Sequence, residues 1–211
     1  MARSDDVLTP LATISFTRDL FKPRDRDNGK KNYGCTLLFS KSEDISKLKQ
    51  LAADAAIAEW GDKAVGMIKD EIIKSPFLDG DGKQGKNKET GEPHKGYPGT
   101  TFIRCSSGED FQPKVFGPSG KTTDRLYSEA ELPSGSKVKA VVNAYTWENK
   151  ENGKGISFGI SIIQLVRKAE GDEVLGGGGG GPDPEKFLEK IDSGDAPEET
   201  KTGAGASGLF G

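Results

Sequence analysis

The sequence predicts a mainly β fold, an OB-like five-stranded Greek-key barrel with a helical insertion, followed by a disordered acidic C-terminal tail. Five segments rich in β-branched and aromatic residues predict the strands. A helical repeat of apolar residues stands between the second and third segments, and large apolar residues become rare after residue 170. A β-sandwich with a helical flap is the alternative architecture.

The strand segments are joined in part by short turns that favour hairpins. Asn28-Gly29 lies in the charged loop between the first two strands, and Asn152-Gly153 lies between the last two. Asn-Gly is the strongest short signal for a tight turn between antiparallel strands. The predicted strands span residues 11–21, 32–39, 100–106, 138–147 and 156–166, with a short additional strand over 114–116.

The helical insertion follows the second strand. Ser40 and Glu43 have the spacing of a capping box, with Ser42 as a rival N-cap, and apolar residues then recur at helical spacing. A shorter helix is expected over residues 63–73. Residues 75–99 form a polar, glycine- and proline-rich segment, which we expect to be a long loop.

The chain divides into a binding domain over residues 1–170 and a flexible tail over residues 171–211. Six consecutive glycines at 176–181 predict a linker, and too few large apolar residues follow them to bury a core. The net charge of −3 hides an asymmetry, because residues 169–211 hold ten acids and only three bases. A mildly basic body with an acidic tail is a charge pattern compatible with a polyanionic ligand.

Composition argues against several other classes of protein. No run of 18 apolar residues predicts a membrane span, and the N-terminus has no apolar signal core. Cys35 and Cys105 both sit in apolar runs, which favours two buried thiols in a reducing cytosol over a disulfide. A single histidine, His94, and the absence of a CxxC motif predict no metal site, and no cofactor is expected.

The loop over residues 80–87 resembles two nucleotide-binding motifs. Gly80, Gly82 and Gly85 fit GxGxxG, and Lys86 nearly completes a P-loop, but Asn87 replaces the required Ser or Thr. Either motif must open a helix, and the sequence that follows cannot form one. The loop is therefore expected to be either a plain solvated loop or a mobile cationic flap that faces DNA.

The loop between the first two strands is rich in cations. Phosphate binding needs cations beside a groove, and loops at the rim of an OB barrel provide them. The alternative is a solvated charged loop. The candidate phosphate-binding residues are Lys22, Arg24, Arg26, Lys30 and Lys31.

Aromatic side chains near these cations are candidates for base stacking. Residues 138–147 alternate between a valine–alanine face, which suits a core, and a mixed basic, polar and aromatic face, which suits binding. Two further tyrosines lie close to lysines in loops or at strand starts. The candidates chosen on these grounds are Tyr33, Lys95, Tyr97, Lys139, Tyr145 and Trp147.

Several segments between residues 10 and 170 together resemble a family of phage single-stranded DNA-binding proteins, formerly catalogued as a domain of unknown function. The resemblance implies an OB-fold and sequence-independent binding of single-stranded DNA. The segments that carry it are ISFTRDLFKP, YGCTLLFSK, SPFLDGDG, HKGYPGTTFIRCSS, VNAYTW and GISFGISIIQLVRKAEG.

We therefore expect a non-enzymatic protein that binds single-stranded DNA during phage DNA replication, recombination or repair, in the cytoplasm of the host cell. The acidic tail is expected to contact replication or recombination proteins, no membrane partner is expected, and a homodimer is left open. The alternative is a phage accessory or interaction protein that does not bind DNA. No nucleophile–base pair supports an enzyme.

Overall fold

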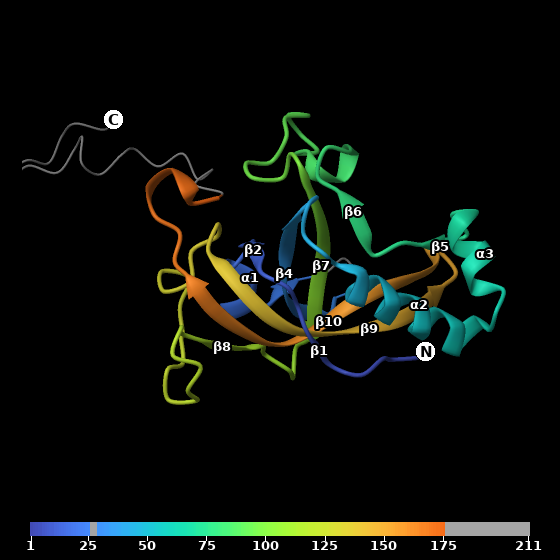
Figure 1. The fold of residues 1–211 in the computed structure, drawn as a ribbon, viewed down its shortest axis with the longest axis horizontal. Helices are drawn as coiled ribbons and strands as arrows, with labels where there is room; N and C mark the ends of the chain where they lie inside the picture. The colour runs from blue at the N-terminus through green and yellow to red at the C-terminus, as the bar shows by residue number, and fades with distance from the viewer. Residues whose placement is uncertain (26–28, 176–211) are drawn as a thin grey trace, which may run out of the picture. The chain divides into compact units, whose positions relative to one another are not determined.

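The computed structural model describes residues 1–25 and 29–175 (Figure 1). The chain separates into two units, Met1–Gly177 and Gly178–Gly211, and the second lies wholly outside the described residues. The expectations for Arg26, for the Asn28-Gly29 turn and for the acidic tail beyond Leu175 therefore concern parts of the chain that are not described.

The five predicted long strands all form, and their pairings close a ring. In the ring β2 pairs with β4, β4 with β7, β7 with β10, β10 with β9, and β9 with β2. The pairing of β7 with β10 is parallel and the others are antiparallel. The mainly β class is confirmed, while the OB type stays an interpretation of this ring. The strands are β2 (Ala12–Ser15), β4 (Lys31–Ser40), β7 (Thr100–Gly108), β9 (Lys137–Asn149) and β10 (Gly153–Arg167).

Short strands extend the sheet at its margins. One of them, β8, coincides with the short strand expected at residues 114–116, and another, β6, lies inside the segment expected to be a loop. That segment also contains the 3-10 helix η1 (Lys83–Gly85), so residues 75–99 are more structured than predicted. The short strands are β1 (Val7–Leu8), β3 (Arg24–Asp25), β5 (Ile73–Lys74), β6 (Phe77–Asp79) and β8 (Lys114–Phe116).

The first strand is shorter than its sequence suggests. We predicted one strand over residues 11–21, but β2 ends at Ser15 and a helical turn, α1 (Arg18–Phe21), follows it. The strand ends because Phe16 adopts a positive φ of 58° and Thr17 turns inward, where its backbone N–H donates to Ser134 Oγ. Apolar and β-branched residues continue through this corner, so composition alone does not mark it.

The helical insertion between β4 and β7 is confirmed, with different boundaries. Helix α2 (Ser46–Trp60) starts after the predicted capping box, because Ser40 Oγ accepts the N–H of Ser42 in a local turn. Helix α3 (Ala64–Lys69) is shorter than predicted, since the chain then forms β5. No helix among residues 1–25 and 29–175 is long and apolar enough to cross a membrane.

Two apolar clusters hold the fold together. The larger one fills the ring of strands and includes the apolar face of α2, with Leu37, Phe39 and Phe158 fully buried. The smaller one lies on the opposite face of β4 and consists of Leu38, Tyr97, Phe102 and Leu175. Leu175 follows the 3-10 helix η2 (Gly171–Glu173), so packed structure reaches five residues beyond the domain boundary expected at 170.

Candidate nucleic-acid interface

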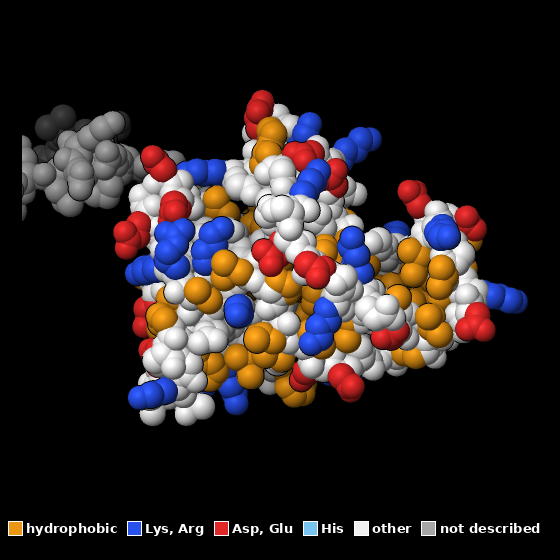
Figure 2. Space-filling view, in the orientation of Figure 1, with side chains coloured by type: hydrophobic (Ala, Val, Ile, Leu, Met, Phe, Trp, Pro, Cys, Tyr) orange, Lys and Arg blue, Asp and Glu red, His pale blue; other side chains and the backbone are white. Residues whose placement is uncertain are grey.

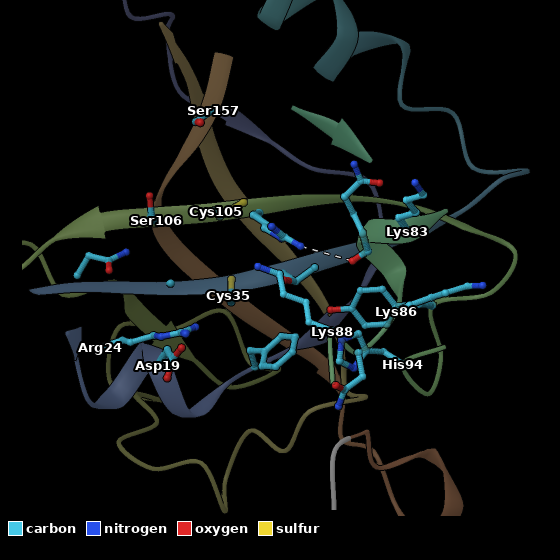
Figure 3. A pocket seen from close by; sticks show the side chains of 18 of the residues that line it. Asp19, Arg24, Cys35, Lys83, Lys86, Lys88, His94, Cys105, Ser106 and Ser157 are labelled. Carbon is cyan, nitrogen blue, oxygen red and sulfur yellow. Dashed lines mark hydrogen bonds between the residues drawn. The ribbon is translucent and has the colours of Figure 1, made fainter. Parts of the chain in front are cut away.

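An open groove of about 1390 Å³ lies on the face of β4 and β7 that points away from the larger cluster (Figure 3). Most of the strand residues that line it alternate along β4 and β7, because successive side chains point to opposite faces. One wall is the segment of residues 80–99 between β6 and β7, which we call the flap. Residues of α1 and β3 lie on the other side, and Tyr145 and Ser157 line the far end. The strand residues that line the floor are Asn32, Gly34, Thr36, Arg104 and Ser106.

Gly34 has no side chain to project into the groove, so the floor is open at this position. A Cβ atom at Gly34 would lie 2.9 Å from the carbonyl oxygen of Cys105, so a side chain there would collide with the neighbouring strand. Cys35 and Cys105 face each other in the register of β4 and β7 and also line the floor. Both are free, buried thiols, as predicted, and burial holds the pKa of Cys105 well above its ordinary value.

The groove carries more positive than negative charge. Five cationic side chains line it, against the three acids Asp19, Asp25 and Glu89. Figure 2 shows acidic and basic side chains interspersed over the flap. In Figure 3, the labelled flap lysines lie well to the right of Arg24 in the view. The groove cations are Arg24, Lys83, Lys86, Lys88 and Arg104.

Glycine packing and hydrogen bonds fix the conformation of the flap. A Cβ at Gly85 would collide with the carbonyl oxygen of Gly80, and one at Gly80 would collide with that of Tyr97. The His94 N–H donates to Gly85 O at 2.9 Å, which closes the loop on itself. The GxGxxG pattern therefore serves close backbone packing, and the loop is held by contacts that the expectation of a mobile flap did not include.

Two acids at the base of the flap bind a lysine. Lys41 Nζ lies 3.0 Å from Asp79 Oδ1 and 2.7 Å from Asp81 Oδ2, and Asp81 Oδ1 also accepts the N–H of Gly99. The hydrogen bonds from Lys41 lower the pKa of both carboxyl groups below the ordinary value. These acids thus anchor the flap to the end of β4.

A row of four rings connects the groove to the smaller cluster. Phe16 meets His94 edge-on, with ring centroids 5.9 Å apart, and His94 lies against Tyr97 at 5.3 Å. Tyr97 in turn packs edge-on against buried Phe102 at 5.0 Å. The guanidinium of Arg104 lies 5.8 Å from the centroid of Phe102. A row of packed rings and the guanidinium of Arg104 therefore lie together at the flap end of the groove.

Three of the predicted DNA-binding residues line the groove: Arg24, Tyr97 and Tyr145. Tyr145 is half-buried, and its hydroxyl lies 3.3 Å from Ser106 Oγ. Tyr97 is only 3% exposed, and burial raises the pKa of its hydroxyl. The expectation that the Tyr97 ring is an exposed stacking platform is therefore wrong, because Leu38 and Leu175 enclose it.

Most of the other predicted residues lie outside this groove. Lys31 Nζ is 4.0 Å from Asp25 Oδ1, and Lys95 Nζ donates to Val174 O at 3.3 Å. Tyr33 is half-buried and shares the face of β4 that bears Cys35. These side chains do not line the groove, although Lys31 contacts Asp25, which does. The predicted residues that do not line it are Lys22, Lys30, Lys31, Tyr33, Lys95, Lys139 and Trp147.

Trp147 lies next to the far end of the groove. Its ring covers Gly155, where a Cβ would collide with it, and its Nε1–H donates to Ser157 Oγ at 3.0 Å. Lys74 Nζ lies 5.9 Å from the centroid of the ring. Ser157 lines the groove, so the half-buried indole that bonds to it adds an aromatic surface to the groove on the side of the β9–β10 turn.

The predicted division of β9 into two faces is correct in outline. Its valine–alanine face is buried, and Lys139 on the other face is exposed. Asn143, on the same side as Lys139, is nevertheless buried. Arg3 Nε donates to Asn143 Oδ1 at 3.0 Å, and Asn143 Nδ2 donates to Asp6 Oδ1 at 2.8 Å. The N-terminal segment thus covers part of the face expected to bind.

Sequence reasoning missed most of the flap side of the groove. Residues 80–87 were considered as a DNA-facing loop, but Lys95 was the one flap lysine selected, and it does not line the groove. The alternation of β7 offers one usable signal, because it places Arg104 and Ser106 on the face opposite the core. The missed lining residues with charged or aromatic side chains are Phe16, Lys83, Lys86, Lys88, His94 and Arg104, together with the three acids.

The described residues offer no obvious metal chemistry. Within residues 1–25 and 29–175, no group of three or more His, Cys, Asp or Glu side chains could hold a metal ion. The arrangement instead combines cations, rings and an open floor, which suits an extended anionic ligand that carries flat groups.

Comparison with known proteins agrees with this chemistry. Residues 6–197 match a family described as the ssDNA-binding protein of Enterobacter phage Enc34. The single-stranded DNA-binding protein of bacteriophage Enc34, solved in complex with ssDNA, is 19% identical, with a TM-score of 0.56 over 78% of this chain and 88% of that one. Another structure of the Enc34 protein is 18% identical, with a TM-score of 0.56 over 87% and 90%.

A more distant similarity extends to another phage. The single-stranded DNA-binding protein gp2.5 of bacteriophage T7 is 13% identical, with a TM-score of 0.50 over 79% of this chain and 94% of that one. These solved structures show a shared fold. No curated protein sequence matches the chain.

Proposed function

The chain belongs to the family of phage single-stranded DNA-binding proteins represented by that of Enterobacter phage Enc34, and we propose that it binds single-stranded DNA in the groove between the flap and β3–α1. The observation that carries the proposal is the lining of this groove. Five cations outnumber three acids there, and exposed or half-buried rings lie among them. Proteins that bind single strands combine these two elements, cations for the phosphates and rings for the bases.

The composition of the groove supports binding without sequence preference. Lysine and arginine side chains contact phosphates, which are identical at every nucleotide, and any base can stack on a ring. The Enc34 protein has been solved with ssDNA in place, and it shares this fold. We place the function in phage DNA replication, recombination or repair, in the cytoplasm of the host, as a binding and not a catalytic role.

The same proposal includes the acidic residues near the C-terminus. Residues 176–211 hold seven acids and three lysines and lie outside the described residues. An acidic segment is a suitable ligand for the basic surfaces of replication or recombination proteins. The oligomeric state is a separate question, and light scattering at several protein concentrations would distinguish a monomer from a homodimer.

A titration of fluorescently labelled oligonucleotides tests the proposal. The expected result is tight binding to a single strand of mixed sequence, weaker binding to the corresponding duplex, and similar affinity for homopolymers of different bases. Equal affinity for the duplex and the single strand would contradict the single-strand preference. No binding to any nucleic acid would favour the alternative of an interaction protein that does not contact DNA.

A further inference from the structure

Phe16 is an apolar ring that the fold leaves in the groove. It is 49% exposed and belongs to neither apolar cluster, although its neighbours Ser15 and Thr17 are both buried. It lines the groove at the corner between β2 and α1. A single exposed phenylalanine is ordinary on a protein surface, but this one faces the proposed DNA site.

The backbone of Phe16 is held in an unfavourable conformation. Its φ of 58° lies in the left-handed region, which is uncommon for a bulky residue other than glycine. Contacts on both sides impose it: Gly135 N–H donates to Ile14 O at 2.7 Å, and Thr17 N–H donates to Ser134 Oγ at 3.2 Å. Such strain is concentrated at functional sites, so an observed outlier there points to a role for its side chain.

The flap supports the ring without covering it. His94 meets Phe16 at an interplanar angle of 83°, and a perpendicular contact cannot cover both faces of the ring. His94 is itself backed by Tyr97 and by buried Phe102. The exposed ring therefore stands at the end of a row of packed rings that fixes its position.

Cationic side chains share the groove with this ring. Lys86 and Lys88 belong to the same flap as His94, and Arg24 lies on the opposite side (Figure 3). A strand that places one base on Phe16 can therefore direct its backbone toward lysine or arginine. This combination is what a stacking site for single-stranded nucleic acid requires.

We propose that Phe16 is a base-stacking residue, where a nucleobase of the bound strand packs on its ring, and that His94 positions it. The inference rests on the proposed function and adds to it a specific contact. It also accounts for the strained backbone, because the left-handed corner turns the side chain of Phe16 out of the core while Ser15 and Thr17 stay buried.

Phe16→Gly separates binding from stability. Glycine adopts a positive φ without a steric penalty, which offsets the entropy that it adds to the unfolded chain, so the melting temperature should change little. The loss of one base stack should weaken binding to an oligothymidine roughly 5- to 150-fold. Phe16→Trp keeps a stacking surface and should retain the affinity. Tyr127→Ala is the matched control, because Tyr127 is 72% exposed but does not line the groove.

An abasic oligonucleotide of the same length provides the second measurement. It keeps the phosphates but offers no base, so wild type and Phe16→Gly should bind it equally. Equal affinity of the two proteins for the oligothymidine would overturn the inference, as would a lower melting temperature accompanied by equal losses on both oligonucleotides. If the wild type bound neither oligonucleotide, the proposed function itself would fail.

Discussion

Replacement of the flap lysines tests the groove quantitatively. Lys86→Ala/Lys88→Ala removes two of the five cations that line it and leaves Arg24, Lys83 and Arg104. Each phosphate neutralised on a single strand contributes roughly −0.7 to the slope of log K against log salt. If every groove cation neutralises one phosphate, the wild-type slope should be roughly −3.5 and that of the variant roughly −2.1.

These slopes predict a large difference in salt sensitivity. Between about 50 mM and about 200 mM salt, the wild type should lose roughly 130-fold in affinity and the double variant roughly 18-fold. Fluorescence anisotropy of a labelled oligothymidine at four or more salt concentrations gives both slopes. The variant should also bind more weakly at the lowest salt, where the two lost contacts matter most.

A control separates contact from net charge. Lys47→Ala/Lys49→Ala changes the net charge by the same amount, but both lysines are exposed on α2 and neither lines the groove. Its slope should equal that of the wild type. If the two double variants changed the slope equally, or if neither changed it, DNA would not pass between the flap and the strands.

Three further perturbations follow from the structure. A chain ending at Leu175 should bind oligothymidine more tightly than the full chain at low salt, because the acids beyond Leu175 compete with DNA for the groove. The difference in affinity should shrink as salt screens the charges of both the acids and the DNA. Equal affinities at the lowest salt would exclude this competition. Trp147→Ala should weaken binding by about 1–3 kcal/mol with an unchanged circular dichroism spectrum, whereas unfolding would assign the indole to the core. The pKa of Asp81 is lowered mainly by its hydrogen bond from Lys41, so its stabilising effect is present above the ordinary value of 3.8 and is lost as the pH falls below it. The protection of the flap amides from hydrogen exchange, measured relative to the exchange rate of an unfolded chain at the same pH, should therefore fall in acid, and Lys41→Ala should reduce that dependence.

Local sequence determined much of the fold. The four later long strands match their predicted spans within three residues at each end, because alternating or continuous β-branched residues leave few other options. The corner at Phe16 escaped prediction because a buried hydrogen bond from the Thr17 N–H to distant Ser134 helps to form it. Likewise, the capping box was wrong because Ser40 bonds within a turn before α2 starts.

The site was less predictable than the fold, because long-range contacts decide which side chains are exposed. Tyr97 stands beside Lys95 in a polar segment and looks solvent-accessible, yet Leu175 covers it. Conversely, Lys86 and Lys88 looked like members of a solvated loop. Only the packing of the flap over β4 and β7 places them in the same groove as Arg104, and no local pattern encodes that packing.

The position of Leu175 links the acidic segment to the binding site. Leu175 packs in the smaller cluster with Tyr97, and Lys95 Nζ donates to Val174 O. The residues that precede the acidic segment therefore support the flap, which supplies the groove lysines.

A cut after residue 170 would remove both the competing acids and this support, with opposite effects on DNA affinity. A cut after Leu175 removes seven acids and leaves the support in place. The chain that ends at Leu175 should thus bind more tightly than the chain that ends at residue 170, and a lower melting temperature of the shorter chain would identify the lost packing as the cause.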